Sequence, residues 1–95
     1  MIYKKSWKYI LKHAFGFYRP MAVKNFSDVS FGELGGFVQS YHNLSQSGNC
    51  WVYNKARVFD NARISENAKV FNAIVKNNSI VSGDTIITGN RNSKI

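Results

Sequence analysis

A six-residue repeat in the C-terminal half is the feature that most constrains the fold. From Cys50 the chain divides into the units CWVYNK, ARVFDN, ARISEN, AKVFN, AIVKNN, SIVSGD and TIITGN, and one unit is a residue short. The first column holds only small residues, namely Cys50, Ala56, Ala62, Ala68, Ala73, Ser79 and Thr85. The third column holds only β-branched residues, namely Val52, Val58, Ile64, Val70, Val75, Val81 and Ile87. Most fifth and sixth positions are Asn, Asp, Glu or Gly, which are turn residues.

Each unit therefore predicts a short strand followed by a corner. The small and the β-branched residue stand two apart and face the same side of a strand, which we expect to be the interior. Three units close a coil of about 18 residues, so coils are predicted at 50–67 and 68–84, with a partial coil at 85–95. The five-residue unit ends at Asn72, where we expect a tightened corner and no lost strand.

The N-terminal segment shows helical spacing of its apolar residues. An apolar arc from Tyr3 to Phe15 comprises Tyr3, Trp7, Ile10, Leu11, Ala14 and Phe15, and it is flanked by Lys4, Lys5, Lys8 and Lys12. This pattern predicts a basic amphipathic helix. The helix would cap an open end of the coils or cover an exposed wall of them, and a membrane-surface helix is the alternative.

The predicted fold class is mainly β: a short parallel β-helix of about 2.5 coils with the N-terminal helix as its cap. A chain of 95 residues forms one domain. Within it we expect a helix at 1–17, a linker segment with Gly-rich turns at 18–49, and the repeats at 50–95. In the linker, Gly35 and Gly36 are interpreted as a turn.

Residues 18–90 resemble a family of small repeat proteins carried by phages and prophages. The shared pattern comprises Tyr18, Arg19, Ala22, Phe26, Asp28, Val29, Gly32, Leu34, Gly35, Gly36, Phe37, Asn43, Leu44, Ser45, Trp51 and Val52. The repeats themselves are similar to hexapeptide-repeat, left-handed parallel β-helices, and this resemblance is the only ground for expecting a left-handed coil. The phage family implies a mobile-element origin and carries no activity over to this chain.

The charge balance favours an anionic partner. The chain has 13 Lys and Arg against 5 Asp and Glu, a formal net charge of +8. The candidate partner-binding residues are Lys4, Lys5, Lys8, Lys12, Arg57, Arg63 and Lys69. The partner would be a host protein or nucleoprotein complex, or nucleic acid. A single cysteine excludes an intrachain disulfide, and without a membrane-spanning apolar run we expect the cytoplasm of a host cell.

Stacking the coils places an aromatic wall on one side, defined by Trp51, Tyr53, Phe71 and Ile86. Another element or a second copy of the chain would cover this wall, or the wall would be the contact surface for a different partner. Proteins that bind single-stranded nucleic acid also place aromatic residues beside Lys and Arg. We expect a homodimer formed through the wall or the C-terminal coil.

The sequence offers little for catalysis. His13 stands on the expected helix, His42 in the linker and Cys50 in the inward column, so no catalytic residue, metal site or cofactor is expected. The predicted function is a non-enzymatic phage or mobile-element binding protein that inhibits a host nucleic-acid-targeting defence complex. The alternatives are a self-associating structural protein and a hexapeptide-type acyltransferase.

Overall fold

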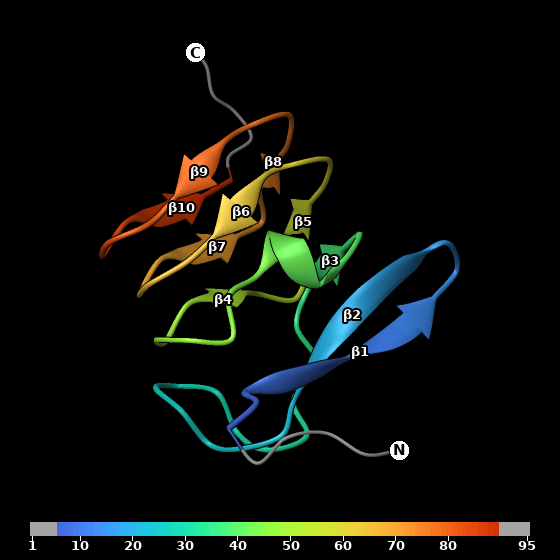
Figure 1. The fold of residues 1–95 in the computed structure, drawn as a ribbon, viewed down its shortest axis with the longest axis vertical. Coiled ribbons are helices and arrows are strands. Elements are labelled where there is room, and N and C mark those ends of the chain that lie inside the picture. Colours follow the sequence, from blue (N-terminus) through green and yellow to red (C-terminus); the bar gives the residue numbers. More distant parts are fainter. Residues whose placement is uncertain (1–5, 90–95) are drawn as a thin grey trace.

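The chain folds into short β-strands arranged in three sheets (Figure 1). The computed structural model describes residues 6–89. Its elements are β1 (Tyr9–Ala14), β2 (Phe17–Ala22), β3 (Phe37–Val38), the 3-10 helix η1 (Tyr41–Asn43), β4 (Trp51–Val52), β5 (Arg57–Val58), β6 (Arg63–Ile64), β7 (Lys69–Phe71), β8 (Ile74–Val75), β9 (Ile80–Val81) and β10 (Ile86–Thr88). The sheet orders are β1-β2-β3-β5-β8, β10-β7-β4 and β6-β9.

The repeat strands pair in parallel, layer upon layer. Trp51 is opposite Lys69, and the spacing between such partners falls to 17 residues after the short unit, where Arg57 is opposite Ile74. Asn72 makes this corner with a φ of 47°, and β8 follows it directly. The expected tightened corner is therefore confirmed, and no strand is lost.

The inward columns form the core. The third-column residues Val58, Ile64 and Val70 are fully buried, and Val75 and Val81 are 6% and 8% exposed. The small column is buried from Cys50 to Ala68, but Ser79 and Thr85 in the last layer are exposed. The inward register read from the repeat is thus confirmed, and burial decreases where the last layer lacks a neighbour within the described residues.

The expected N-terminal helix is wrong, and with it the expected fold class. Residues 9–22 form an antiparallel hairpin, β1–β2, and no α-helix occurs within residues 6–89. The hairpin turns at Phe15 and Gly16, which both adopt positive φ, 49° and 89°. The segment also fits a strand, because Tyr9 and Leu11 are two residues apart and both pack on the core, while Lys12 is exposed.

The sheets also differ from a closed, helix-capped coil. Parallel pairing covers only part of the structure: the five-stranded sheet starts with two antiparallel pairs, β1–β2 and β2–β3. The hairpin crosses the boundary expected between residues 17 and 18, and in Figure 1 it lies at the opposite end of the stack from β9 and β10. Within residues 6–89 no helix has the length and hydropathy that crossing a membrane requires.

Gly35 and Gly36 serve a close backbone approach. Gly36 N–H donates to the Val52 carbonyl at 2.8 Å, and Gly35 N–H donates to the Pro20 carbonyl at 2.7 Å. A Cβ atom on Gly35 would lie 2.5 Å from the Val52 carbonyl oxygen, so no larger residue fits without a backbone shift. Their interpretation as a simple turn is therefore replaced by a packing role.

The inward register predicts how two matched substitutions differ. Val70→Asp places an unpaired charge at a fully buried position, which costs several kcal/mol and should unfold the protein. Ile80→Asp changes a side chain that is 74% exposed and should leave the fold nearly as stable as the parent. Thermal unfolding followed by circular dichroism checks both, and equal losses would show that the register is wrong.

Candidate partner-binding face

The outer side of the five-stranded sheet brings together basic and aromatic side chains. Residues that are paired across strands point to the same side, and the registers align Lys12 with Arg19 and align Phe37, Arg57 and Ile74 in one row. Phe17 and Arg19 are two apart on β2 and share a side. We call this surface the basic-aromatic face and define it as Lys12, Phe17, Arg19, Phe37, Arg57, Phe59, Ile74 and Lys76.

Cation–π and aromatic contacts hold the centre of this face together. The guanidinium groups of Arg19 and Arg57 lie 5.1 and 5.8 Å from the ring centroid of Phe37. The Phe17 ring lies 6.4 Å from that of Phe37 and 5.2 Å from that of Phe59. Such contacts contribute about 0.5–1 kcal/mol each at exposed sites, and they orient the guanidinium groups along the surface.

No ion pair within the described part of the chain involves a cation of this face. None of its five strands contains Asp or Glu. Asp60 borders the face, because it directly follows Phe59, and its carboxylate accepts from the backbone N–H of Asn77. The Glu66 carboxylate accepts from the backbone N–H of Gly83. Within residues 6–89 the single ion pair joins Lys69 and Asp28 at 3.6 Å, outside this face.

The other predicted basic residues do not join the face. Lys12 and Arg57 belong to it, whereas Arg63 lies on β6 and donates to the His42 carbonyl at 2.6 Å. Lys69 lies on β7, where it pairs with Asp28 and donates to the Ser27 hydroxyl at 2.9 Å. Lys4 and Lys5 lie outside the described residues. The predicted basic set is therefore divided among three sheets.

Lys8, expected on the outside, is buried instead. It is 1% exposed, and its ammonium group donates to the Cys50 carbonyl at 2.7 Å and lies 3.3 Å from the Cys50 sulfur. A third donation reaches the Gly48 carbonyl at 3.3 Å. Burial lowers the pKa of Lys8 below its ordinary value of 10.5, because desolvation disfavours the charged form. Lys8 is therefore a structural residue with no access to a partner.

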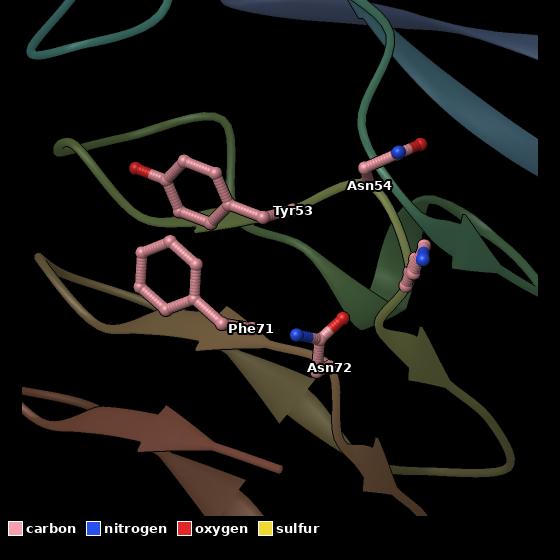
Figure 2. A pocket seen from close by; sticks show the side chains of 5 residues that line it. Tyr53, Asn54, Phe71 and Asn72 are labelled. Carbon is pink, nitrogen blue, oxygen red and sulfur yellow. The ribbon is translucent and has the colours of Figure 1, made fainter.

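The aromatic wall is largely covered from within the chain. Trp51 is fully buried, and its ring packs 6.1 Å from Tyr9 and 5.2 Å from Phe26. Tyr53 and Phe71 stack on each other at 4.1 Å (Figure 2). Ile86 alone of the four wall residues is strongly exposed, at 62%. The hairpin and the segment after it thus provide the cover that the sequence required.

A pocket of about 280 Å³ lies beside the stacked pair, lined by Tyr53, Asn54, Lys55, Phe71 and Asn72. Figure 2 shows Asn54 and Asn72 to one side of the two rings. The Tyr53 hydroxyl donates to the Asp28 carboxylate at 2.6 Å, and this bond lowers the pKa of Asp28. Arg19 connects the pocket to the basic-aromatic face, because it donates to the Asn54 side-chain oxygen at 2.8 Å.

The histidines and the cysteine do not converge. His13 packs edge-on against Tyr18 on the hairpin, with ring centroids 5.4 Å apart. His42 belongs to η1, and its Nε2 lies 3.2 Å from the Asn61 carbonyl oxygen. Cys50 is buried beside Lys8. Among residues 6–89 no group of three His, Cys, Asp or Glu side chains is placed to hold a metal ion.

Six members of the face were not among the predicted site residues, namely Phe17, Arg19, Phe37, Phe59, Ile74 and Lys76. Phe17, Arg19 and Phe37 stand outside the repeats: Phe17 ends the segment expected to be a helix, and Arg19 and Phe37 lie in the expected linker. The signal that was present is the Phe17–Tyr18–Arg19 alternation, which places an aromatic and a basic side chain on one side of a strand. Their union with Arg57 depends on pairing between distant segments.

Comparison with known proteins gives a short similarity. No protein-family model matches the chain. A stretch of 35 residues, 37% of this chain, is 40% identical to an uncharacterized acetyltransferase, YdcK, of Escherichia coli (strain K12). The matched stretch spans 11% of that protein.

The burial of Lys8 predicts how stability depends on pH. Its pKa is lower in the folded state than in the unfolded chain, so the unfolded chain binds more protons and stability rises with pH. As the pH rises through the folded-state pKa of Lys8 towards 10.5, the parent should gain stability relative to Lys8→Met. Urea denaturation of both proteins at several pH values measures this difference. The control is Lys55→Met, which removes the positive charge of an exposed lysine in another part of the chain. If the parent and Lys8→Met respond to pH alike, the prediction is wrong.

Proposed function

We propose that the chain is a non-enzymatic binding protein whose basic-aromatic face engages an anionic partner. The observation that carries the proposal is the charge of this face: Lys12, Arg19, Arg57 and Lys76 are present, and the five strands contain no acid. Cations without a neighbouring acid raise the rate at which an anionic partner associates with the protein, and they make the affinity sensitive to salt. Within residues 6–89 the acids support corners and loops, and the single ion pair, between Asp28 and Lys69, lies outside the face.

The partner is a host complex that carries nucleic acid. The resemblance to small phage- and prophage-borne repeat proteins supports a mobile-element origin, and such a protein would act in the cytoplasm of the host. By occupying the nucleic-acid-binding part of a defence complex, a rigid basic sheet would block the access of its target. In a host culture that carries an RNA-guided defence system, expression of the parent should allow a targeted phage to infect. Expression of the charge variants described below should not.

Catalysis is the less supported function. The similarity to an uncharacterized acetyltransferase favours it, but the chain spans a small part of that protein. His13 and His42 lie on different elements, and His42 already contacts the Asn61 carbonyl. A general base needs a position beside bound substrate, and neither histidine lines the pocket next to Tyr53 and Phe71. These placements support binding without chemistry.

Self-association is the second candidate function, and three exposed isoleucines favour it. Ile74, Ile80 and Ile86 are 61%, 74% and 62% exposed. They lie on β8, β9 and β10, and each of these is an edge strand of its sheet. Edge strands with exposed aliphatic side chains are able to pair with another chain. This end of the stack, rather than the covered aromatic wall, is the place where a homodimer would form.

Charge reversal on the face tests the proposed function. Lys12→Glu and Arg57→Glu should each weaken binding to heparin, and each should reduce the slope of log affinity against log salt by about 1. Lys24→Glu is the matched control, since it makes the same change on an exposed residue outside the five strands. Heparin titrations over a salt series measure all of these. Equal losses in the control and in the face variants would assign the binding to net charge alone.

A separate pair of variants tests self-association. Ile80→Lys and Ile86→Lys should convert a dimer into monomers, because each places a charge at an apolar contact between edge strands. Multi-angle light scattering of the parent and both variants gives the mass in solution. A parent that remains monomeric at high concentration would remove the second candidate and leave the first unaffected.

A further inference from the structure

We propose that the basic-aromatic face binds single-stranded nucleic acid, with bases on its phenylalanine rings and phosphates on its cations. This inference rests on the proposed function and names the ligand class for the same face. It is distinct from general polyanion binding, because it requires the rings as well as the charges. RNA and DNA share this chemistry, and the experiment below separates them.

The first argument is the placement of the aromatic rings. Phe17, Phe37 and Phe59 are half-buried in the middle of the face, where each is anchored by its neighbours. A pocket of about 100 Å³ lined by Phe17, Phe37 and Arg57 lies among them. It is smaller than the ~300 Å³ of an ordinary enclosed ligand site, so it suits a flat group laid against the surface. Nucleobases are flat and stack on aromatic side chains.

The second argument is the placement of the charges around the rings. Lys12 and Arg19 stand on the β1–β2 side, and Arg57 and Lys76 stand on the β5–β8 side. Neighbouring strands are about 4.8 Å apart, so the five strands extend over ~19 Å from first to last. A backbone crossing this width meets cations at both borders and rings between them. The same combination of a positive groove and stacking rings serves sequence-tolerant single-strand binders.

The third argument excludes the competing polyanions. In a duplex the faces of the bases are stacked on one another, so its phosphates would contact the cations and the three rings would have no base to stack on. An acidic protein surface presents carboxylates, which pair with Arg19 and Arg57 and also leave the rings without a partner. Only a ligand that has both exposed flat groups and regularly spaced negative charges would contact the phenylalanine rings and the guanidinium groups of this face together.

The surface also continues beyond the sheet. Arg19 donates to Asn54 at 2.8 Å, and Asn54 lines the pocket shown in Figure 2 together with Lys55 and Asn72. A strand that leaves the rings at Arg19 therefore reaches a second cation and two amide side chains. Amides hydrogen-bond the edges of unpaired bases, so this pocket extends the same kind of contact around the corner.

The test compares four probes on the full chain. Fluorescence anisotropy is measured with labelled single-stranded RNA and DNA of about 12 nucleotides. This length lies within the ~4–16 nucleotides that one single-strand-binding domain covers. A DNA duplex of the same sequence and heparin are added as competitors. Phe37→Leu and Phe17→Leu keep an apolar side chain and remove the ring. Each should weaken single-strand binding by about 5- to 150-fold while heparin binding stays unchanged.

The control and the opposing outcomes are specific. Phe31→Leu removes an exposed ring outside the five strands, and it should bind like the parent. If single strands, duplex and heparin bind alike and the leucine variants have no effect, this inference fails and the proposed function stands. If no polyanion binds at low salt, both fail. Circular dichroism checks that each variant is folded. If Phe37→Leu is unfolded, the comparison of Phe17→Leu with the parent tests the inference. A higher affinity for the RNA or for the DNA single strand shows which of the two nucleic acids the face prefers.

Discussion

The hydrogen bonds around Gly35 and Gly36 join the N-terminal hairpin to the repeats, and the candidate face depends on that joint. Gly35 N–H is bound by the Pro20 carbonyl of β2, and Gly36 N–H by the Val52 carbonyl of β4. Because neither position has room for a Cβ, the chain passes close enough for β3 to lie between β2 and β5. Phe37 of β3 is thereby placed between the guanidinium groups of Arg19 and Arg57. A larger residue in this segment would separate the two halves of the face.

The distribution of charge follows from what corners and strands require. Corners with positive φ leave backbone N–H groups to be satisfied, and Asp60 and Glu66 each adopt positive φ and accept from the next layer. The strands of the five-stranded sheet need no such acceptors, so their outward positions are free for Lys and Arg. Lys8 shows the opposite use of a cation, since its ammonium group satisfies carbonyls inside the fold. Net charge alone does not distinguish these two roles.

The repeat made the C-terminal half predictable, whereas the N-terminal half depends on contacts between distant segments. Val58, Ile64 and Val70 were placed inside because period-two spacing and corner residues agreed over seven units. The hairpin was missed because its apolar residues fit two periodicities at once. Of the face, Lys12 and Arg57 were predicted, but Phe17 and Phe37 join them only through strand pairing across the chain. The burial of Lys8 depends on the loop around Gly48 and Cys50, which no local pattern reveals.

The six-residue unit also affects how such a chain can change in length. Partner residues are 18 apart between β4 and β7, and 17 apart where the five-residue unit lies between them, as for Asn61 and Asn78. An insertion of one whole layer at the β8–β10 end would present each sheet with a new strand in the correct register. An insertion that is not a multiple of six residues would displace the corners, and an odd one within a strand would turn the β-branched column outward. We therefore expect natural and designed variants of this architecture to grow by complete layers at the β8–β10 end, where a new strand beside β8 would widen the sheet that carries the face.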